Sequence, residues 1–155
     1  MSRRCAVTVE SAQFFGTFTP KLDEKGRIFL PAKFRAMFHE GVVLAKGQEN
    51  CIYGWKPETF SELTQKLRAS SFTNRQVRYF QRSLYASAST EVPDKQGRIA
   101  IPGLLREWAS LERDCAVIGA MDRIEIWDEQ RWTQFTAEQD EAFANLGEEE
   151  DFDLF

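Results

Sequence analysis

The chain contains the stretch Asp23-Glu24-Lys25-Gly26-Arg27-Ile28-Phe29-Leu30-Pro31 and, 71 positions later, the related stretch Asp94-Lys95-Gln96-Gly97-Arg98-Ile99-Ala100-Ile101-Pro102. The aspartate, glycine, arginine, isoleucine and proline are the same in both copies, and the remaining apolar positions keep their apolar character. A repeat that preserves its turn, its charges and its apolar phase indicates two half-domains that need each other to close a core.

Each copy has the pattern of a turn, a strand and a short helix. In the first copy, Lys25 and Gly26 supply a polar residue and the permissive glycine of a tight turn, and the apolar residues after them alternate as in a strand. Pro31 then stands where a helix can begin with its φ angle preset. Asp23 and Arg27 are therefore predicted to flank a loop, and the second copy repeats the arrangement.

Two further apolar stretches and a longer helix follow each copy. The helical periodicity predicts trailing helices over Pro57–Ala69 and about Asp128–Phe143. Between the halves, Thr73–Gln76 matches a capping box and predicts the start of a bridging helix. The sequence thus predicts an α+β fold in which each half has the order β-β-α-β-β.

The charge of the chain is divided unevenly along its 155 residues. The formal net charge is −4, but eight acidic residues and no Lys or Arg follow residue 137, so the first 137 residues carry a net charge of +4. A basic body with an acidic tail is what an anion-binding protein shows, although an ordinary solvated surface reaches the same charge without a partner.

Several classes of protein are disfavoured. No apolar run is long enough to span a membrane and the N-terminus lacks a secretory signal, so we expect a cytoplasmic protein with no membrane partner. Three cysteines without a CxxC pair favour neither a disulfide framework nor a zinc site, so no metal or cofactor is expected. A single histidine, His39, and the absence of phosphate-binding glycine loops argue against an enzyme.

The two copies resemble the paired signatures of the MraZ family, in Leu22–Arg35 and Pro93–Pro102. The resemblance extends from Phe14 to about Phe143 and includes the Asp-x-x-x-Arg pair of each half. It implies two tandem AbrB-like modules that form a pseudo-two-fold swapped-hairpin barrel with flanking helices. It also implies a ring-shaped homo-oligomer, with an octamer as the first expectation.

The function implied by this resemblance is that of a bacterial transcriptional regulator, with repression as its expected sign. It binds double-stranded DNA at tandem promoter repeats upstream of the division and cell-wall genes, and is nucleoid-associated. The corresponding division of the chain is a disordered extension (1–13), a first module with its trailing helix (14–70), a bridging helix (71–87), a second module with its C-terminal helix (88–144) and a disordered acidic tail (145–155).

The resemblance places Arg27 and Arg98 at the motif positions associated with DNA contact. A guanidinium on a narrow loop can neutralise phosphate and can also read guanine O6 and N7 in the major groove. The weaker candidates for DNA contact are the other cations near the two loops: Lys21, Lys25, Lys95, Arg35 and Arg106.

Two alternatives remain open. Asp23 and Asp94 are expected to be structural turn residues, with Gly26 and Gly97 at positive φ, and each Asp–Arg pair could be an internal ion pair that only fixes its hairpin. The protein could also be a non-enzymatic ring whose basic loops bind an acidic partner. An excess of aromatic residues favours subunit contacts in either case: Phe18, Phe29, Trp55, Phe60, Phe80 and Tyr85.

Overall fold

The computed structural model of the chain describes residues 13–70 and 73–148. The predicted disorder of the N-terminal extension and of the acidic tail concerns residues that lie largely outside these ranges. The strands are β1 (Thr17–Phe18), β2 (Arg27–Phe29), β3 (Val42–Lys46), β4 (Ile52–Trp55), β5 (Ser89–Glu91), β6 (Arg98–Ala100), β7 (Cys115–Gly119) and β8 (Ile124–Asp128). The α-helices are α2 (Ala32–Arg35), α3 (Pro57–Ala69), α4 (Arg75–Ser87), α5 (Gly103–Trp108) and α6 (Glu129–Ala144), and 3₁₀ turns cover Ala36–Phe38, Gln48–Asn50 and Leu146–Glu148.

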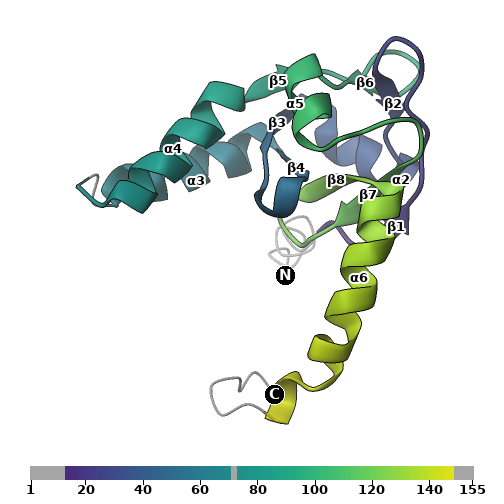
Figure 1. Cartoon of the computed structure of the whole chain (residues 1–155). Helices are drawn as coiled ribbons and strands as arrows, with labels where there is room; N and C mark the ends of the chain where they lie inside the picture. The colour runs from purple at the N-terminus through teal and green to yellow at the C-terminus, as the bar shows by residue number, and fades with distance from the viewer. Residues whose placement is uncertain (1–12, 71–72, 149–155) are drawn as a thin grey trace, which may run out of the picture.

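The order of elements confirms the predicted α+β fold with two tandem halves. The first half runs β1, β2, α2, β3, β4 and ends in α3, and the second runs β5, β6, α5, β7, β8 and ends in α6. Helix α4 connects them along the chain (Figure 1). The division of the chain into five segments stays a prediction, because element bounds alone do not define domains.

The halves exchange their first strands. Six strands form one sheet in the order β1-β7-β8-β4-β3-β5, so β1 pairs with β7 of the second half and β5 pairs with β3 of the first. If each strand is replaced by its counterpart in the other half (β1 by β5, β3 by β7 and β4 by β8, and the reverse), the same order is obtained backwards. The sheet therefore has a pseudo-two-fold axis between β4 and β8. Among the described residues no ladder joins β2 and β6 to this sheet, so closure into a barrel stays a prediction.

Both faces of the six-stranded sheet are covered. One face packs against the β2–β6 pair and the short helices, in a core that includes Ile28, Phe34, Ile99 and Leu105. The other face packs against the longer helices through a cluster centred on Trp127. Because both faces are buried, β3 and β7 read as nearly continuous apolar runs.

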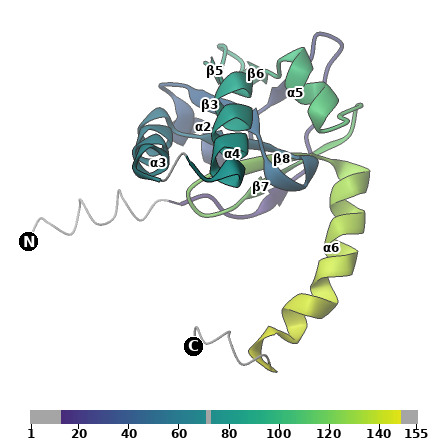
Figure 2. The same ribbon diagram turned by 60° about the vertical axis from the view of Figure 1, so that its left-hand side comes forward.

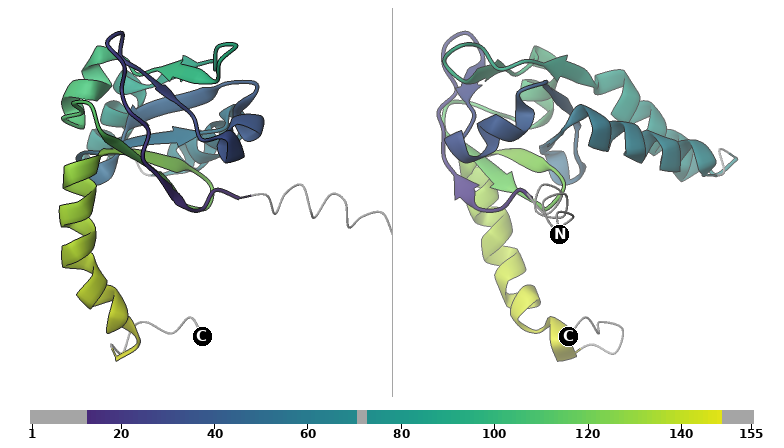
Figure 3. Two further views of the ribbon diagram at one scale, coloured as in Figure 1. Left: turned by 90° about the vertical axis from the view of Figure 1, so that its right-hand side faces the viewer. Right: turned by 180° about the vertical axis from the view of Figure 1, so that it is seen from behind.

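The longer helices leave the body in two directions. Helices α3 and α4 form a hairpin, in which the Gln81 side chain donates to the Leu67 carbonyl at 2.9 Å, and this hairpin extends to one side of the sheet (Figures 1 and 3). Helix α6 contacts the sheet near its start, where Trp132 and Phe135 lie against Trp127. Its second half projects away from the rest of the chain (Figure 2), and Phe143 is 75% exposed.

One local prediction, the cap of α4, is wrong by one residue. The cap of α4 is Asn74 rather than Thr73: the Asn74 side chain accepts hydrogen bonds from the backbone N–H groups of Gln76 and Val77. Both residue types cap helices well, so sequence alone did not separate them. In the short helix α5, Leu105 is buried in the core and its neighbour Leu104 is 53% exposed.

Candidate nucleic-acid interface

The two copies of the motif meet in one short antiparallel ribbon. Strand β2 pairs with β6 so that Arg27 lies opposite Ala100, Ile28 opposite Ile99 and Phe29 opposite Arg98. The ladder continues beyond both strands, because the Leu30 N–H donates to the Gly97 carbonyl at 2.9 Å and the Ile101 N–H to the Gly26 carbonyl at 2.8 Å. The two motif loops therefore lie at opposite ends of a single ribbon.

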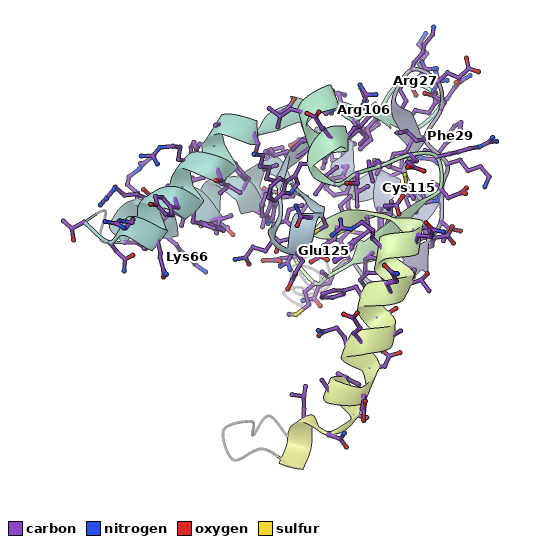
Figure 4. All side chains as sticks on the ribbon, in the orientation of Figure 1. Arg27, Phe29, Lys66, Arg106, Cys115 and Glu125 are labelled. Carbon is purple, nitrogen blue, oxygen red and sulfur yellow. The ribbon has the colours of Figure 1, made fainter. Side chains whose placement is uncertain are left out.

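The ribbon has a buried face and an outer face. Ile28 and Ile99 point into the core and are 0% and 1% exposed. Alternation along a strand then places Arg27 and Phe29 of β2, and Arg98 and Ala100 of β6, on the outer face. Figure 4 shows the labelled Arg27 and Phe29 at this end of the molecule, far from Lys66 on the α3–α4 hairpin.

Each loop is closed by its aspartate. One carboxylate oxygen of Asp23, Oδ1, accepts hydrogen bonds from the backbone N–H groups of Lys25 and Arg27, both at 2.9 Å. The Gly26 N–H donates to the Asp23 carbonyl at 3.0 Å, and Gly26 has φ 78°, which a side chain would strain. The second loop repeats this geometry with Asp94, and Gly97 has φ 85°.

The other carboxylate oxygen orients the arginine. Arg27 Nε donates to Asp23 Oδ2 at 2.9 Å, and Arg98 Nε donates to Asp94 Oδ2 at 2.8 Å. The arginine side chains remain 28% and 22% exposed. The ion pair is thus present in both loops, yet it engages only Nε, so the two terminal amino groups of each guanidinium lie outside the pair and can serve as a fork for a base edge.

These hydrogen bonds lower the pKa values of both aspartates. For Asp23 the largest cause is the bond from the Arg27 backbone N–H, followed, against the penalty of burial, by the bond from the Arg27 side chain. Asp94 has the same causes, with Arg98 in place of Arg27. Both carboxylates are therefore ionised near neutral pH and hold the loops in their closed form.

Arg35 and Arg106 each reach the loop of the other half. The Arg35 guanidinium donates to the Leu30 carbonyl at 2.9 Å and covers the backbone of Gly97. Symmetrically, Arg106 Nε donates to the Ile101 carbonyl at 2.9 Å and covers Gly26. Both arginines thus contact the glycines of the turns, whereas Arg27 and Arg98 lie on the outer face of the ribbon.

The lysines near the two loops differ in whether they have an ion-pair partner. Lys21 forms an exposed ion pair of 2.8 Å with Asp114, whereas Lys25 and Lys95 stand exposed near the apices of the two loops. A surface hollow of about 750 Å³ lies beside the first loop, and its lining includes Lys25, Arg27 and Phe29. Arg113 also lines this hollow. Sequence reasoning missed Arg113, because nothing in the repeat pattern links it to the motif.

Other kinds of site are not seen in the part of the chain that the structure describes. No three His, Cys, Asp or Glu side chains of residues 13–70 and 73–148 come together as metal ligands do. None of the helices within these ranges combines the length and apolar character needed to cross a bilayer. His39 is exposed, and its Nδ1 lies 3.1 Å from the Ala36 carbonyl oxygen, to which the protonated nitrogen donates a hydrogen bond.

Comparison with known proteins supports one family. The family model described as "MraZ protein, putative antitoxin-like" matches twice, over residues 13–83 and 84–154. A "Transcriptional regulator MraZ" of Thermobifida fusca is 53% identical over 136 residues, which is 88% of this chain and 95% of that protein. Proteins of the same name from Salinispora tropica and Leifsonia xyli are each 50% identical, over 87% and 88% of this chain and 95% of their own length. The chain belongs to the MraZ family.

Proposed function

We propose that the protein is a sequence-specific DNA-binding regulator of transcription, and that the outer face of the β2–β6 ribbon enters the major groove. The relatives named as transcriptional regulators support the regulatory part of this proposal. The observation that carries the DNA-binding part is the placement of Arg27 and Arg98 on one exposed ribbon, each oriented by its own aspartate.

The dimensions of the ribbon suit the groove. Two strands lie about 4.8 Å apart, and the major groove is about 12 Å wide and admits a two-stranded ribbon. Arg27 and Arg98 are diagonal neighbours across the ladder, so their Cα atoms lie roughly 7–8 Å apart. With a rise of about 3.4 Å per base pair, the two guanidinium groups reach bases about two steps apart.

The loops divide the work between base edges and phosphates. The terminal amino groups of Arg27 and Arg98 supply the fork that pairs with guanine O6 and N7. Lys25 and Lys95, at the loop apices, contact phosphates on either side of the groove and add affinity without sequence preference. Arg35 and Arg106 hold the turns from behind.

One ribbon reads only a few base pairs, so useful specificity requires several copies at fixed spacing. We therefore propose that the protein forms a ring-shaped homo-oligomer, with an octamer as the first expectation. The ring binds tandem promoter repeats upstream of the division and cell-wall genes and represses those genes. The protein acts in the cytoplasm, at the nucleoid, and has no catalytic activity. Cutting the target to one repeat should lower the affinity steeply.

The decisive experiment uses the full-length protein and duplexes from the region upstream of its own gene. Arg27→Lys and Arg98→Lys keep the charge but remove the fork, so each should weaken specific binding by about 1–3 kcal/mol and leave binding to random duplex nearly unchanged. Arg82→Lys, the same change at an exposed arginine on α4, is the matched control. The turns should survive, because Asp23 and Asp94 still accept their backbone hydrogen bonds.

Two results would contradict this proposal. If the wild-type protein bound random duplex as tightly as its upstream region at physiological salt, the basic loops would serve an acidic partner without sequence recognition. If both lysine variants bound the native site as tightly as the wild type, the arginines would not read bases.

A further inference from the structure

An aromatic side chain lies exposed in the middle of the ribbon. Phe29 occupies the outer face of β2, between the buried residues Ile28 and Leu30, and is 50% exposed. A single exposed apolar side chain is common on protein surfaces, but Phe29 is set apart by its place, opposite Arg98 and two residues after Arg27 on the face proposed to enter the groove. The other exposed aromatic side chains among the described residues are Tyr79 and Tyr85 on α4, Phe143 on α6, and Phe15, and none of them lies on the ribbon.

The β2–β6 ladder fixes the position of the Phe29 backbone beside Arg98. The neighbouring Leu30 is bonded to Gly97 across the ladder, and the Arg98 guanidinium lies over the Phe29 ring with Cζ 6.0 Å from its centroid. Phe29 and Arg98 form a non-hydrogen-bonded pair, in which Cα atoms approach to about 4.5 Å. The ring therefore stands beside the same arginine that Asp94 orients.

We infer that Phe29 is a specificity-determining residue that packs against the C5-methyl group of a thymine in the major groove. This inference rests on the proposed function. The thymine methyl is the one apolar group that a base pair presents in that groove, and an apolar side chain on a ribbon that enters the groove meets it directly. The base concerned adjoins the one that Arg98 reads.

The position related by the pseudo-two-fold axis does not repeat this chemistry. Where the first half has Phe29, the second has Ala100, which is exposed but extends only one carbon from the backbone. The two ends of the ribbon therefore present the same arginine with different apolar neighbours. The preferred site is accordingly asymmetric, with a thymine required beside one arginine position and not beside the other.

Replacing single thymines by deoxyuridine tests the inference, because it removes only the methyl group. The full-length protein is titrated against duplexes from the region upstream of its own gene, each with one substituted position. Loss of a buried methyl corresponds to about fourfold in affinity, from about 0.8 kcal/mol per carbon. We expect such a loss for wild type at one or two positions of each repeat, and no loss at those positions for Phe29→Ala.

Matched variants and a second base analogue separate the alternatives. Tyr79→Ala removes an equally exposed aromatic and should keep the wild-type response to deoxyuridine. Phe29→Leu should show part of the wild-type response to deoxyuridine that Phe29→Ala loses. Replacing guanines by 7-deazaguanine should weaken binding of wild type and Phe29→Ala alike, because the arginines still read N7.

Three results would overturn the inference. Equal deoxyuridine responses in wild type and Phe29→Ala, with the 7-deazaguanine effect intact, would refute the role of Phe29 and leave the proposed function standing. A change of molecular mass for Phe29→Ala in light scattering would identify the ring as a subunit contact instead. Absence of any sequence preference in the wild-type protein would remove the proposed function itself.

Discussion

Replacing Gly97 by alanine should lower the free energy of unfolding, in part because the added methyl group meets a side chain of the other half of the chain. Gly97 has φ 85°, a conformation that costs an L-residue about 1–2 kcal/mol. An added Cβ would meet the Arg35 side chain, with Cζ 2.6 Å and Cδ 2.9 Å away. Arg35 is exposed and can swing aside, but it then gives up its hydrogen bond to the Leu30 carbonyl, worth about 1 kcal/mol. The expected loss is about 2–3 kcal/mol.

Gly26 and Gly147 supply graded controls. At Gly26, where φ is 78°, an added Cβ would lie 3.0 Å from Arg106 Cζ, so Arg106 needs to move only slightly and Gly26→Ala should cost about 1–2 kcal/mol. No atom of the described residues lies within 4 Å of the Cβ position at Gly147, so Gly147→Ala should change stability by less than about 0.5 kcal/mol.

The assay is urea unfolding at one fixed protein concentration, followed by the fluorescence of the buried Trp127 and Trp55. The Gly97→Ala cost should shrink by about 1 kcal/mol in an Arg35→Ala background, because the clash and the hydrogen bond are then already gone. An unchanged cost in that background, or equal costs for Gly97→Ala and Gly147→Ala, would refute the contact between the halves.

Three further outcomes are expected. Hydrogen bonds lower the pKa of Asp94, so the contribution of Asp94 to folding stability is present above the ordinary aspartate pKa near 3.8 and is lost as the pH falls through the lowered pKa. In urea unfolding, Asp94→Asn should therefore reduce the loss of stability that the protein shows below about pH 4. Burial raises the pKa of Cys115 to about 11, so iodoacetamide at about pH 8 should modify Cys115 only after unfolding, read by mass spectrometry in a Cys5→Ser background. Removal of residues 145–155 should raise affinity for random duplex at low salt, because five acidic groups no longer compete with phosphate, and a low-salt titration showing no change would place the tail away from the loops.

The local features of the motif were open to prediction because they depend on neighbouring residues. A glycine between polar residues and an alternating apolar strand carry their own conformational preferences, and the α+β order of both halves follows from them. The pairing of the strands cannot be predicted in this way. The pairing of Thr17 with Ile118 joins segments about a hundred residues apart, and no local preference of either strand encodes it.

The candidate site was predictable to the same extent. The repeat points to Arg27 and Arg98, but the packing of Arg35 over Gly97 depends on the pairing of β2 with β6, so the sequence alone identifies Arg35 only as a further cation. For the same reason the sequence alone groups Phe29 with the aromatic residues expected at subunit contacts, because its place beside Arg98 depends on the pairing of β2 with β6.

The joining of both halves in one polypeptide has a consequence for how a site can be oriented. A dimer of identical half-units presents two equal ends, and its target must read the same in both directions. Covalent linkage frees Phe29 and Ala100 to differ at equivalent places while the exchanged strands keep the two ends in one rigid frame. The two ends of the ribbon therefore differ, and copies of the chain arranged in a closed ring would match DNA elements that are all repeated in the same direction.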